Sequence, residues 1–174
     1  MILLEEAVII KLKNTQTLLC TIESCTGGLI AHLITNVPGA SEVYWGSLVT
    51  YDNSAKEELG ISSDLITTQG AVSPEVAQAM AEKGLERMEN NPFRWNSHSL
   101  LKPKALICLA TTGIAGPSGG SLSKPVGLCF IGLALSGQKT LIKKVLVSES
   151  LTRIQMKTQF AHQALEFIKQ VSIE

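Results

Sequence analysis

Apolar runs and amphipathic segments alternate along most of the chain. Segments that are apolar throughout, or that alternate between apolar and polar residues as strands do, are residues 17–23, 42–52, 104–111, 127–135 and 139–147. Apolar residues recur at helical spacing in residues 1–14, 26–37, 53–59, 71–88 and 152–171. Strands that alternate with helices predict an α/β protein, in which helices cover both faces of a sheet. We therefore expect a three-layer α/β/α sandwich with a mixed, mostly parallel sheet, mixed because residues 127–147 form a hairpin.

Local signals mark the ends and the buried face of several predicted helices. Ser73 is expected to cap the 71–88 helix, with Pro74 at its first position and an acidic residue in its first turn. Pro38 and Gly39 end the helix that begins at residue 26. The last helix is expected to bury one face, made of Ile154, Phe160, Ala161, Ala164, Leu165 and Ile168.

Composition and length indicate one folded domain over residues 1–174. Hydrophobic residues make up 45% of the chain and charged residues 17%, a balance that excludes a disordered protein. One segment, ENNPFRWNSHSLLKP at residues 89–103, breaks the periodic pattern. We interpret it as a surface insertion, and a role as a lid or a partner-binding segment is the alternative.

The charge balance narrows the choice of partners and location. Lysine plus arginine and aspartate plus glutamate both number 15, which argues against a protein that binds nucleic acid through bulk phosphate attraction. The first segment contains Glu5, Glu6 and Lys11 and lacks the basic start of a signal peptide. No uninterrupted apolar run approaches the roughly 20 residues that span a bilayer. We expect a soluble, cytoplasmic protein with no membrane or nucleic-acid partner.

Cysteine and histidine spacing gives no sign of a metal centre. The cysteines form no CxxC pair, so buried reduced thiols are favoured over a disulfide framework or a metal site; they are Cys20, Cys25, Cys108 and Cys129. The histidines form no HxxxH or HExxH pair and are His32, His98 and His162. We expect neither a metal ion nor a cofactor.

Residues capable of chemistry concentrate in three segments. ESCTGG, at residues 23–28, lies where a strand turns into a helix, and VTYDNSAK brings Tyr51 and Lys56 close together in the sequence. The third segment, residues 111–127, is rich in glycine and hydroxyl groups but matches neither the Walker A spacing nor GxGxxG. A structural turn and a cradle for phosphate or ribose both remain open for it.

Taken together, ESCTGG, VTYDNSAK, GAVSPEVA and TGIAGPSGG…KPVG, in this order, resemble the CinA C-terminal domain family over nearly the whole chain. The resemblance implies an α/β/α fold and a nicotinamide-nucleotide amidohydrolase. Such an enzyme deamidates nicotinamide mononucleotide to nicotinic acid mononucleotide and ammonia in pyridine-nucleotide salvage, without a metal. It also implies a homo-oligomer, most simply a dimer, and a stand-alone form of a domain that in longer members follows a molybdopterin-binding-like domain. The alternative is a non-catalytic nucleotide-binding module that senses a nucleotide or a partner.

By the same resemblance, Ser24 is the nucleophile, Lys56 the base and Tyr51 a supporting hydroxyl. A Ser–Lys pair is an established variant of nucleophile plus base, and it requires the pKa of the lysine to be lowered. Taken one by one, each residue has a structural alternative. Ser24 could be only an N-cap, Lys56 a solvated helix residue and Tyr51 a strand aromatic. Cys25 is expected to pack as a small apolar residue.

The remaining motif residues are candidates for substrate binding. The N–H groups of Thr26, Gly27 and Gly28 are expected to be free to donate at a helix N-terminus. Arg153 matches a family arginine and is a candidate phosphate ligand. The candidates for phosphate or ribose in the glycine-rich segment are Thr112, Gly113, Gly116 and Gly119.

Three features depart from the family pattern. Ser47 replaces a glycine in the strand before Tyr51, and Lys157 replaces a second arginine of the last helix. The third is the 89–103 insertion, which precedes the strand that leads into the glycine-rich segment. All three leave Ser24, Tyr51 and Lys56 unchanged. They therefore bear on substrate preference and not on the identity of the catalytic residues.

Overall fold

The computed structural model describes residues 2–91 and 103–173. The helices of this part of the chain are α1 (Leu4–Asn14), α2 (Leu29–Thr35), the 3-10 helix η1 (Ala40–Glu42), α3 (Asn53–Glu58), α4 (Ser63–Gln69), α5 (Pro74–Glu89) and α6 (Arg153–Gln170). The strands are β1 (Thr17–Glu23), β2 (Tyr44–Val49), β3 (Ala105–Gly113), β4 (Leu128–Leu135) and β5 (Leu141–Leu146). Every segment predicted as a strand contains one. Helix α4 lies in a region to which the sequence pattern assigned no element.

The strands of the described residues form one five-stranded sheet in the order β2-β1-β3-β4-β5. Strands β2, β1 and β3 are parallel, and β4 runs antiparallel to both β3 and β5. Glu23 at the end of β1 is paired with Val49 on one side and Thr111 on the other. The carboxyl ends of the three parallel strands therefore lie together, which is where open α/β sheets place their ligands.

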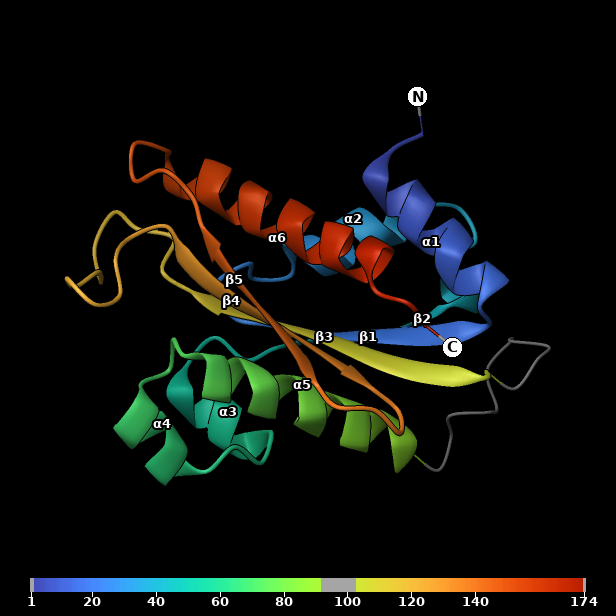
Figure 1. Ribbon diagram of the computed structural model, residues 1–174, viewed down its shortest axis with the longest axis horizontal. Helices are drawn as coiled ribbons and strands as arrows, with labels where there is room; N and C mark the ends of the chain where they lie inside the picture. The colour runs from blue at the N-terminus through green and yellow to red at the C-terminus, as the bar shows by residue number, and fades with distance from the viewer. Residues whose placement is uncertain (1, 92–102, 174) are drawn as a thin grey trace.

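Helices cover both faces of the sheet. Figure 1 shows α1, α2 and α6 on one face and α3, α4 and α5 on the other, so the predicted three-layer α/β/α sandwich is confirmed. One apolar cluster packs Leu12, Ile30 and Phe160 between the sheet and the first layer. Another packs Val76 and Met80 of α5 against the opposite face.

Helix boundaries follow local capping chemistry. The Ser73 hydroxyl accepts a hydrogen bond from the N–H of Val76 and so starts α5, with Pro74 at its first position. Helix α2 begins at Leu29 rather than near residue 26 as expected. The reason is that Gly27 and Gly28 have φ values of 61° and 88°, which lie outside the helical region.

The buried face of α6 differs from the prediction at one position. Ile154 is 64% exposed, whereas Met156 is 1% exposed and packs in the core. Ile154 lies in the first turn of α6, and its exposure shows that no neighbouring element of the described residues covers this end of the face. The other residues predicted for this face are buried, namely Phe160, Ala161, Ala164, Leu165 and Ile168.

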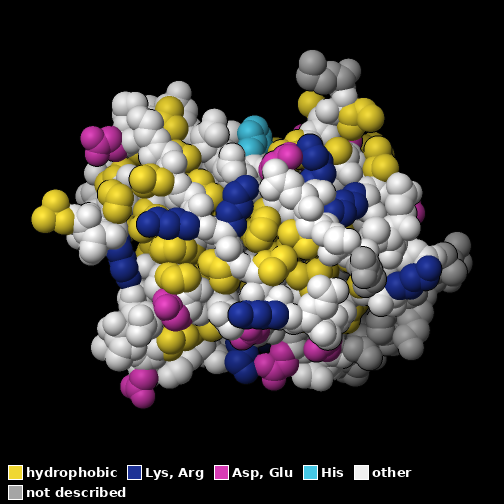
Figure 2. Space-filling model, in the orientation of Figure 1, with side chains coloured by type: hydrophobic (Ala, Val, Ile, Leu, Met, Phe, Trp, Pro, Cys, Tyr) yellow, Lys and Arg dark blue, Asp and Glu magenta, His cyan; other side chains and the backbone are white. Residues whose placement is uncertain are grey.

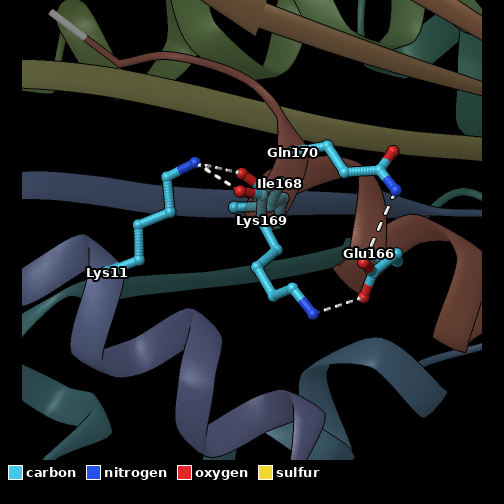
Figure 3. A network of polar contacts seen from close by, with 5 residues as sticks. All are labelled: Lys11, Glu166, Ile168, Lys169 and Gln170. Atoms are coloured by element: carbon cyan, nitrogen blue, oxygen red, sulfur yellow. Dashed lines mark hydrogen bonds and ion pairs between the residues drawn. The ribbon is translucent and has the colours of Figure 1, made fainter.

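A lysine joins the first helix to the last. Lys11 Nζ donates to the carbonyl oxygens of Ile168 at 2.9 Å and Lys169 at 2.8 Å (Figure 3). It also donates to the carbonyl oxygen of Val171. These carbonyls belong to the C-terminal end of α6, where helices leave acceptors unpaired. Burial lowers the pKa of Lys11. The contact holds the two helices together through charge-assisted hydrogen bonds.

The surface includes an apolar region along the edge strand. Figure 2 shows apolar side chains that reach the surface between the two helical layers, where β5 crosses the view. Leu141 and Leu146 of β5 are 38% and 61% exposed.

Among the described residues, no helix combines the length and the apolar character needed to cross a membrane.

The sequence also led us to expect a surface insertion at residues 89–103 and four buried cysteines. Most of the predicted insertion, residues 92–102, lies outside the described residues, and Glu89 is the last residue of α5. The cysteines are free thiols and are buried, as expected: Cys20, Cys25, Cys108 and Cys129.

Candidate active site

Ser24 stands at the point where β1 ends and the turn into α2 begins. Its backbone N–H donates to the carbonyl of Thr111 on the neighbouring strand at 3.0 Å. The residue is 8% exposed, so it lies at the edge of the core rather than on an open surface. Gly28, not Ser24, is the N-cap of α2. The interpretation of Ser24 as a simple N-cap is therefore wrong.

Lys56 of α3 reaches Ser24 from the adjacent segment of chain. Its Nζ lies 3.2 Å from Ser24 Oγ, 2.9 Å from the carbonyl oxygen of Thr50 and 3.2 Å from that of Tyr51. The residue is 1% exposed, so the interpretation of Lys56 as a solvated helix residue is also wrong. A neutral amine has two N–H bonds and one lone pair. With the two carbonyls accepting the N–H groups, the lone pair of neutral Lys56 faces the Ser24 hydroxyl.

The surroundings of Lys56 favour the neutral amine. Burial lowers its pKa, against a smaller opposing effect of the negative charge of Asp52. The Asp52 carboxylate accepts hydrogen bonds from the N–H and the hydroxyl of Ser54, which lower the pKa of Asp52. Asp52 is thus held as the N-cap of α3, which fixes the start of the helix that carries Lys56.

Tyr51 contributes to the site through its main chain. Its carbonyl accepts from Lys56, but its hydroxyl accepts a hydrogen bond from Arg153 Nη2 at 2.7 Å. The residue is 60% exposed. Within the described residues the Tyr51 hydroxyl bonds to neither Ser24 nor Lys56. The structure therefore brings Ser24 and Lys56 together by their side chains and places the Tyr51 hydroxyl at the rim.

Arg153 links this rim to the glycine-rich segment. Its Nη1 donates to the carbonyl of Gly116 at 2.7 Å while Nη2 donates to Tyr51. One helical turn further along α6, Lys157 lies against the turn after Ser24. A Cβ built on Gly27 would be only 3.2 Å from Lys157 Nζ. Lys157 thus lies against the Ser24 turn, and Arg153 lies at the rim formed by Tyr51 and Gly116.

The turn itself offers fewer free N–H groups than expected. The N–H of Gly28 donates to the Glu23 carboxylate at 2.9 Å, and that of Gly27 donates to the carbonyl of Ser24 at 3.1 Å. The expectation that both are free to donate is wrong, because the turn closes on itself. The N–H groups of Cys25 and Thr26 have no acceptor among the described residues. They are the donors that the turn presents beside Ser24.

Threonine hydroxyls near the strand ends are engaged within the protein. The Thr26 hydroxyl lies 2.8 Å from that of Thr111, and both residues are fully buried. The Thr112 hydroxyl donates to the carbonyl of Ala71 at 2.7 Å and is buried. These side chains brace the site rather than line an open surface.

The glycines of the glycine-rich segment, residues 111–127, differ in their surroundings. A Cβ on Gly113 would lie 2.7 Å from the carbonyl oxygen of Leu128. Gly116 has a φ of 64°, and a Cβ there would lie 2.6 Å from a methyl group of Val126. Gly119 has a φ of 91° and is exposed. Close packing therefore explains Gly113 and Gly116, and Gly119 is the exposed position of these three.

Sequence reasoning missed two neighbours of the site. Glu23 is fully buried and accepts hydrogen bonds from the first turn of α2, although it was read only as the end of a strand. In the sequence, Lys157 is only a departure from the family pattern, and its place beside the turn follows from the fold of α6 over that turn. The charge of Glu23 at the end of an otherwise uncharged, buried strand is the signal that identifies it. Among the described residues, no cluster of three or more acidic, histidine or cysteine side chains is arranged to hold a metal ion.

Comparison with known proteins gives consistent matches. A family model described as the CinA C-terminal domain matches residues 2–92 and 97–172. A competence-damage inducible protein of Caldanaerobacter subterraneus is 46% identical over 156 residues, covering 89% of this chain and 34% of the relative. A CinA-like protein of Thermotoga neapolitana is 39% identical over 167 residues, covering 95% of this chain and 36% of the relative. The chain thus spans about a third of the length of these curated relatives.

Solved structures share the fold. The competence/damage inducible protein CihA from Agrobacterium tumefaciens has a TM-score of 0.80 and 34% identity, with 97% of both chains covered. A CinA superfamily protein from Klebsiella pneumoniae has a TM-score of 0.82 and 23% identity, covering 96% of this chain and 94% of that one. The second similarity concerns the fold alone.

Proposed function

The chain belongs to the CinA C-terminal domain family, and we propose that it hydrolyses the carboxamide of nicotinamide mononucleotide, releasing nicotinic acid mononucleotide and ammonia. The observation that carries the proposal is the buried contact between Lys56 Nζ and Ser24 Oγ at 3.2 Å. Amide hydrolysis needs a nucleophile, a base that activates it and donors for the oxyanion. This site has a candidate for each of these roles.

In the proposed first step, neutral Lys56 removes the Ser24 proton as Oγ bonds to the amide carbon. The resulting oxyanion accepts hydrogen bonds from the N–H groups of Cys25 and Thr26, which have no acceptor among the described residues. The Lys56 ammonium then returns the proton to the amide nitrogen, the C–N bond breaks, and ammonia leaves. An ester between the acyl group and Ser24 remains.

In the second step, Lys56 takes a proton from a water molecule that attacks this ester. The ester C–O bond breaks, Ser24 regains its proton from Lys56, and the acid product loses its remaining proton to solvent and leaves as the carboxylate. Arg153 lies at the rim beside Tyr51, and Lys157 lies against the turn after Ser24; their charges favour a substrate with an anionic group, such as a nucleoside monophosphate. No cofactor takes part in this sequence of bond changes.

The test is ammonia release from nicotinamide mononucleotide by micromolar protein. Ser24→Ala should abolish release, while Ser41→Ala, which changes an exposed serine of η1, should leave it unchanged. Retention of activity in Ser24→Ala would show that another group is the nucleophile. Tight binding of the nucleotide without ammonia release would instead point to a non-catalytic nucleotide-binding module.

A further inference from the structure

Glu23 is a buried carboxylate placed immediately before the candidate nucleophile. Its side chain is fully buried and accepts hydrogen bonds from backbone N–H groups at the start of α2. The N–H groups of Gly28 and Ile30 donate to Oε2 at 2.9 Å and 3.1 Å, and that of Ala31 donates to Oε1 at 2.9 Å. Both carboxylate oxygens are thus used to hold one helix end.

This arrangement replaces an ordinary helix cap. The N-cap of α2 is Gly28, which has no side chain to accept from the first-turn N–H groups. Glu23 supplies the acceptor from the end of the preceding strand, and its negative charge lies at the positive end of the helix. The Ser47 hydroxyl donates to Oε1 from β2 at 3.4 Å. Because its charge is surrounded by donors, the carboxylate is stable without water.

The main chain of Glu23 connects to the base as well. Its carbonyl accepts from the N–H of Thr50 at 2.9 Å, and the carbonyl of Thr50 accepts from Lys56 Nζ at 2.9 Å. The next residue in the chain is Ser24. One residue therefore joins the turn that carries the nucleophile, the helix that follows it and the strand end that holds the base.

We propose that Glu23 is a positioning residue for the hydrolytic reaction: its carboxylate fixes the start of α2 and so sets the position of Ser24 relative to Lys56. The inference rests on the proposed function, since it concerns the same serine and lysine. Glu23 is enclosed and does not contact substrate. A further consequence is that the first-turn N–H groups of α2 are not available to a substrate phosphate, because a carboxylate of the protein occupies them.

Glu23→Gln is the direct test, since the amide keeps the shape but turns one acceptor into an NH₂ group that faces a backbone N–H. Misplacement of Ser24 should lower kcat for nicotinamide mononucleotide by about ten- to a hundredfold, with KM changed by less than about threefold. Labelling of Ser24 by a fluorophosphonate should slow by a similar factor. The pH midpoint of labelling should not move, because Lys56 is untouched. Glu42→Gln, which alters an exposed carboxylate paired with Lys13, is the matched control.

Several outcomes would overturn the proposal. Folded Glu23→Gln with kcat and labelling within about twofold of wild type would do so, as would an equal loss in Glu42→Gln. A loss of kcat that only follows the unfolded fraction in circular dichroism would show a purely structural role. If Glu23→Gln does not fold, Glu23→Asp keeps the charge but is one methylene too short to reach all three N–H groups, and it should show the same loss of kcat.

Two further measurements keep this test independent of the substrate. In the wild type, the amide protons of Gly28, Ile30 and Ala31 should be protected from hydrogen exchange, and rapid exchange would contradict the contacts on which the proposal rests. If the wild type is labelled at Ser24 but releases no ammonia, the proposed substrate is wrong. The labelling rates of the Glu23 variants then still decide whether Glu23 positions the serine.

Discussion

Replacement of Lys56 by methionine tests the central contact of the site. Methionine has nearly the same length and is apolar, so it fills the buried space of the lysine but cannot accept a proton. The variant leaves Ser24 without its partner at 3.2 Å and leaves the carbonyls of Thr50 and Tyr51 without their donor. Lys83→Met, at a half-buried lysine paired with Glu86 at the surface, is the matched control.

The expected loss of activity follows from the role of a general base. Such groups contribute about 10²–10⁴-fold to rate, which corresponds to roughly 3–5 kcal/mol of activation free energy. In the wild type, kcat/KM should rise with pH as Lys56 loses its proton. The midpoint should lie below 10.5, because burial lowers the pKa of Lys56 from that ordinary value. The residual rate of Lys56→Met should lack this rise.

The stability of the variant should change far less than its activity. Between the lowered pKa of Lys56 and 10.5, the unfolded chain binds more protons than the folded one. The free energy of unfolding of the wild type therefore rises with pH across this window. At pH values below this window, each pH unit by which the pKa of Lys56 is lowered reduces the free energy of unfolding of the wild type by about 1.4 kcal/mol. Lys56→Met avoids this cost and loses hydrogen bonds, so at neutral pH we expect it to be about as stable as the wild type.

The assay is ammonia release from nicotinamide mononucleotide between about pH 6 and pH 10, with urea unfolding of both proteins at the same pH values. Two results would refute the reasoning. One is a Lys56→Met rate within about tenfold of wild type. The other is a pH midpoint that is unchanged in the variant, which would assign the titration to a different group.

Three other predictions concern the rim, the helix clamp and assembly. Arg153→Ala should raise KM for nicotinamide mononucleotide by a factor equivalent to about 1.5–3 kcal/mol and should hardly affect nicotinamide riboside, which lacks the phosphate. Equal effects on both would show that Arg153 shapes the rim, through Tyr51 and Gly116, without binding phosphate. Lys11→Met leaves carbonyl groups at the end of α6 unpaired, so it should lower the free energy of unfolding by about 1–3 kcal/mol and leave kcat unchanged. An unaltered thermal midpoint would show that the contact between Lys11 and α6 does not stabilise the protein. The exposed Ile2, Leu3 and Ile10 around α1 support a dimer, so light scattering should give about twice 18.7 kDa, and a monomer would refute it.

Local patterns in the sequence determined the strands, most of the helices and several of their ends, although α4 was missed and α2 begins later than expected. The spacing of apolar residues located the strands, because side chains on one face recur every second residue in a strand but every three or four residues in a helix. Ser73 and Pro74 marked the start of α5, because capping involves residues only a few positions apart. The same reasoning placed Ser24 in a strand-to-helix turn. The turn residues were recognisable because glycine is needed where φ is positive, as at Gly27 and Gly28.

Tertiary structure decided which of these residues meet. The burial of Lys56 and its approach to Ser24 depend on the parallel register of β1 and β2, which brings Thr50 beside Glu23. A pattern of polar residues does not encode that register. Ile154 has the spacing of a core residue yet is exposed, because periodicity identifies a face of the helix but not whether a neighbouring element covers that face along its whole length. The role of Glu23 as an acceptor for α2 was the hardest to recognise in the sequence. A carboxylate at a strand end gains these partners only when the following helix folds back and presents its unpaired N–H groups to it.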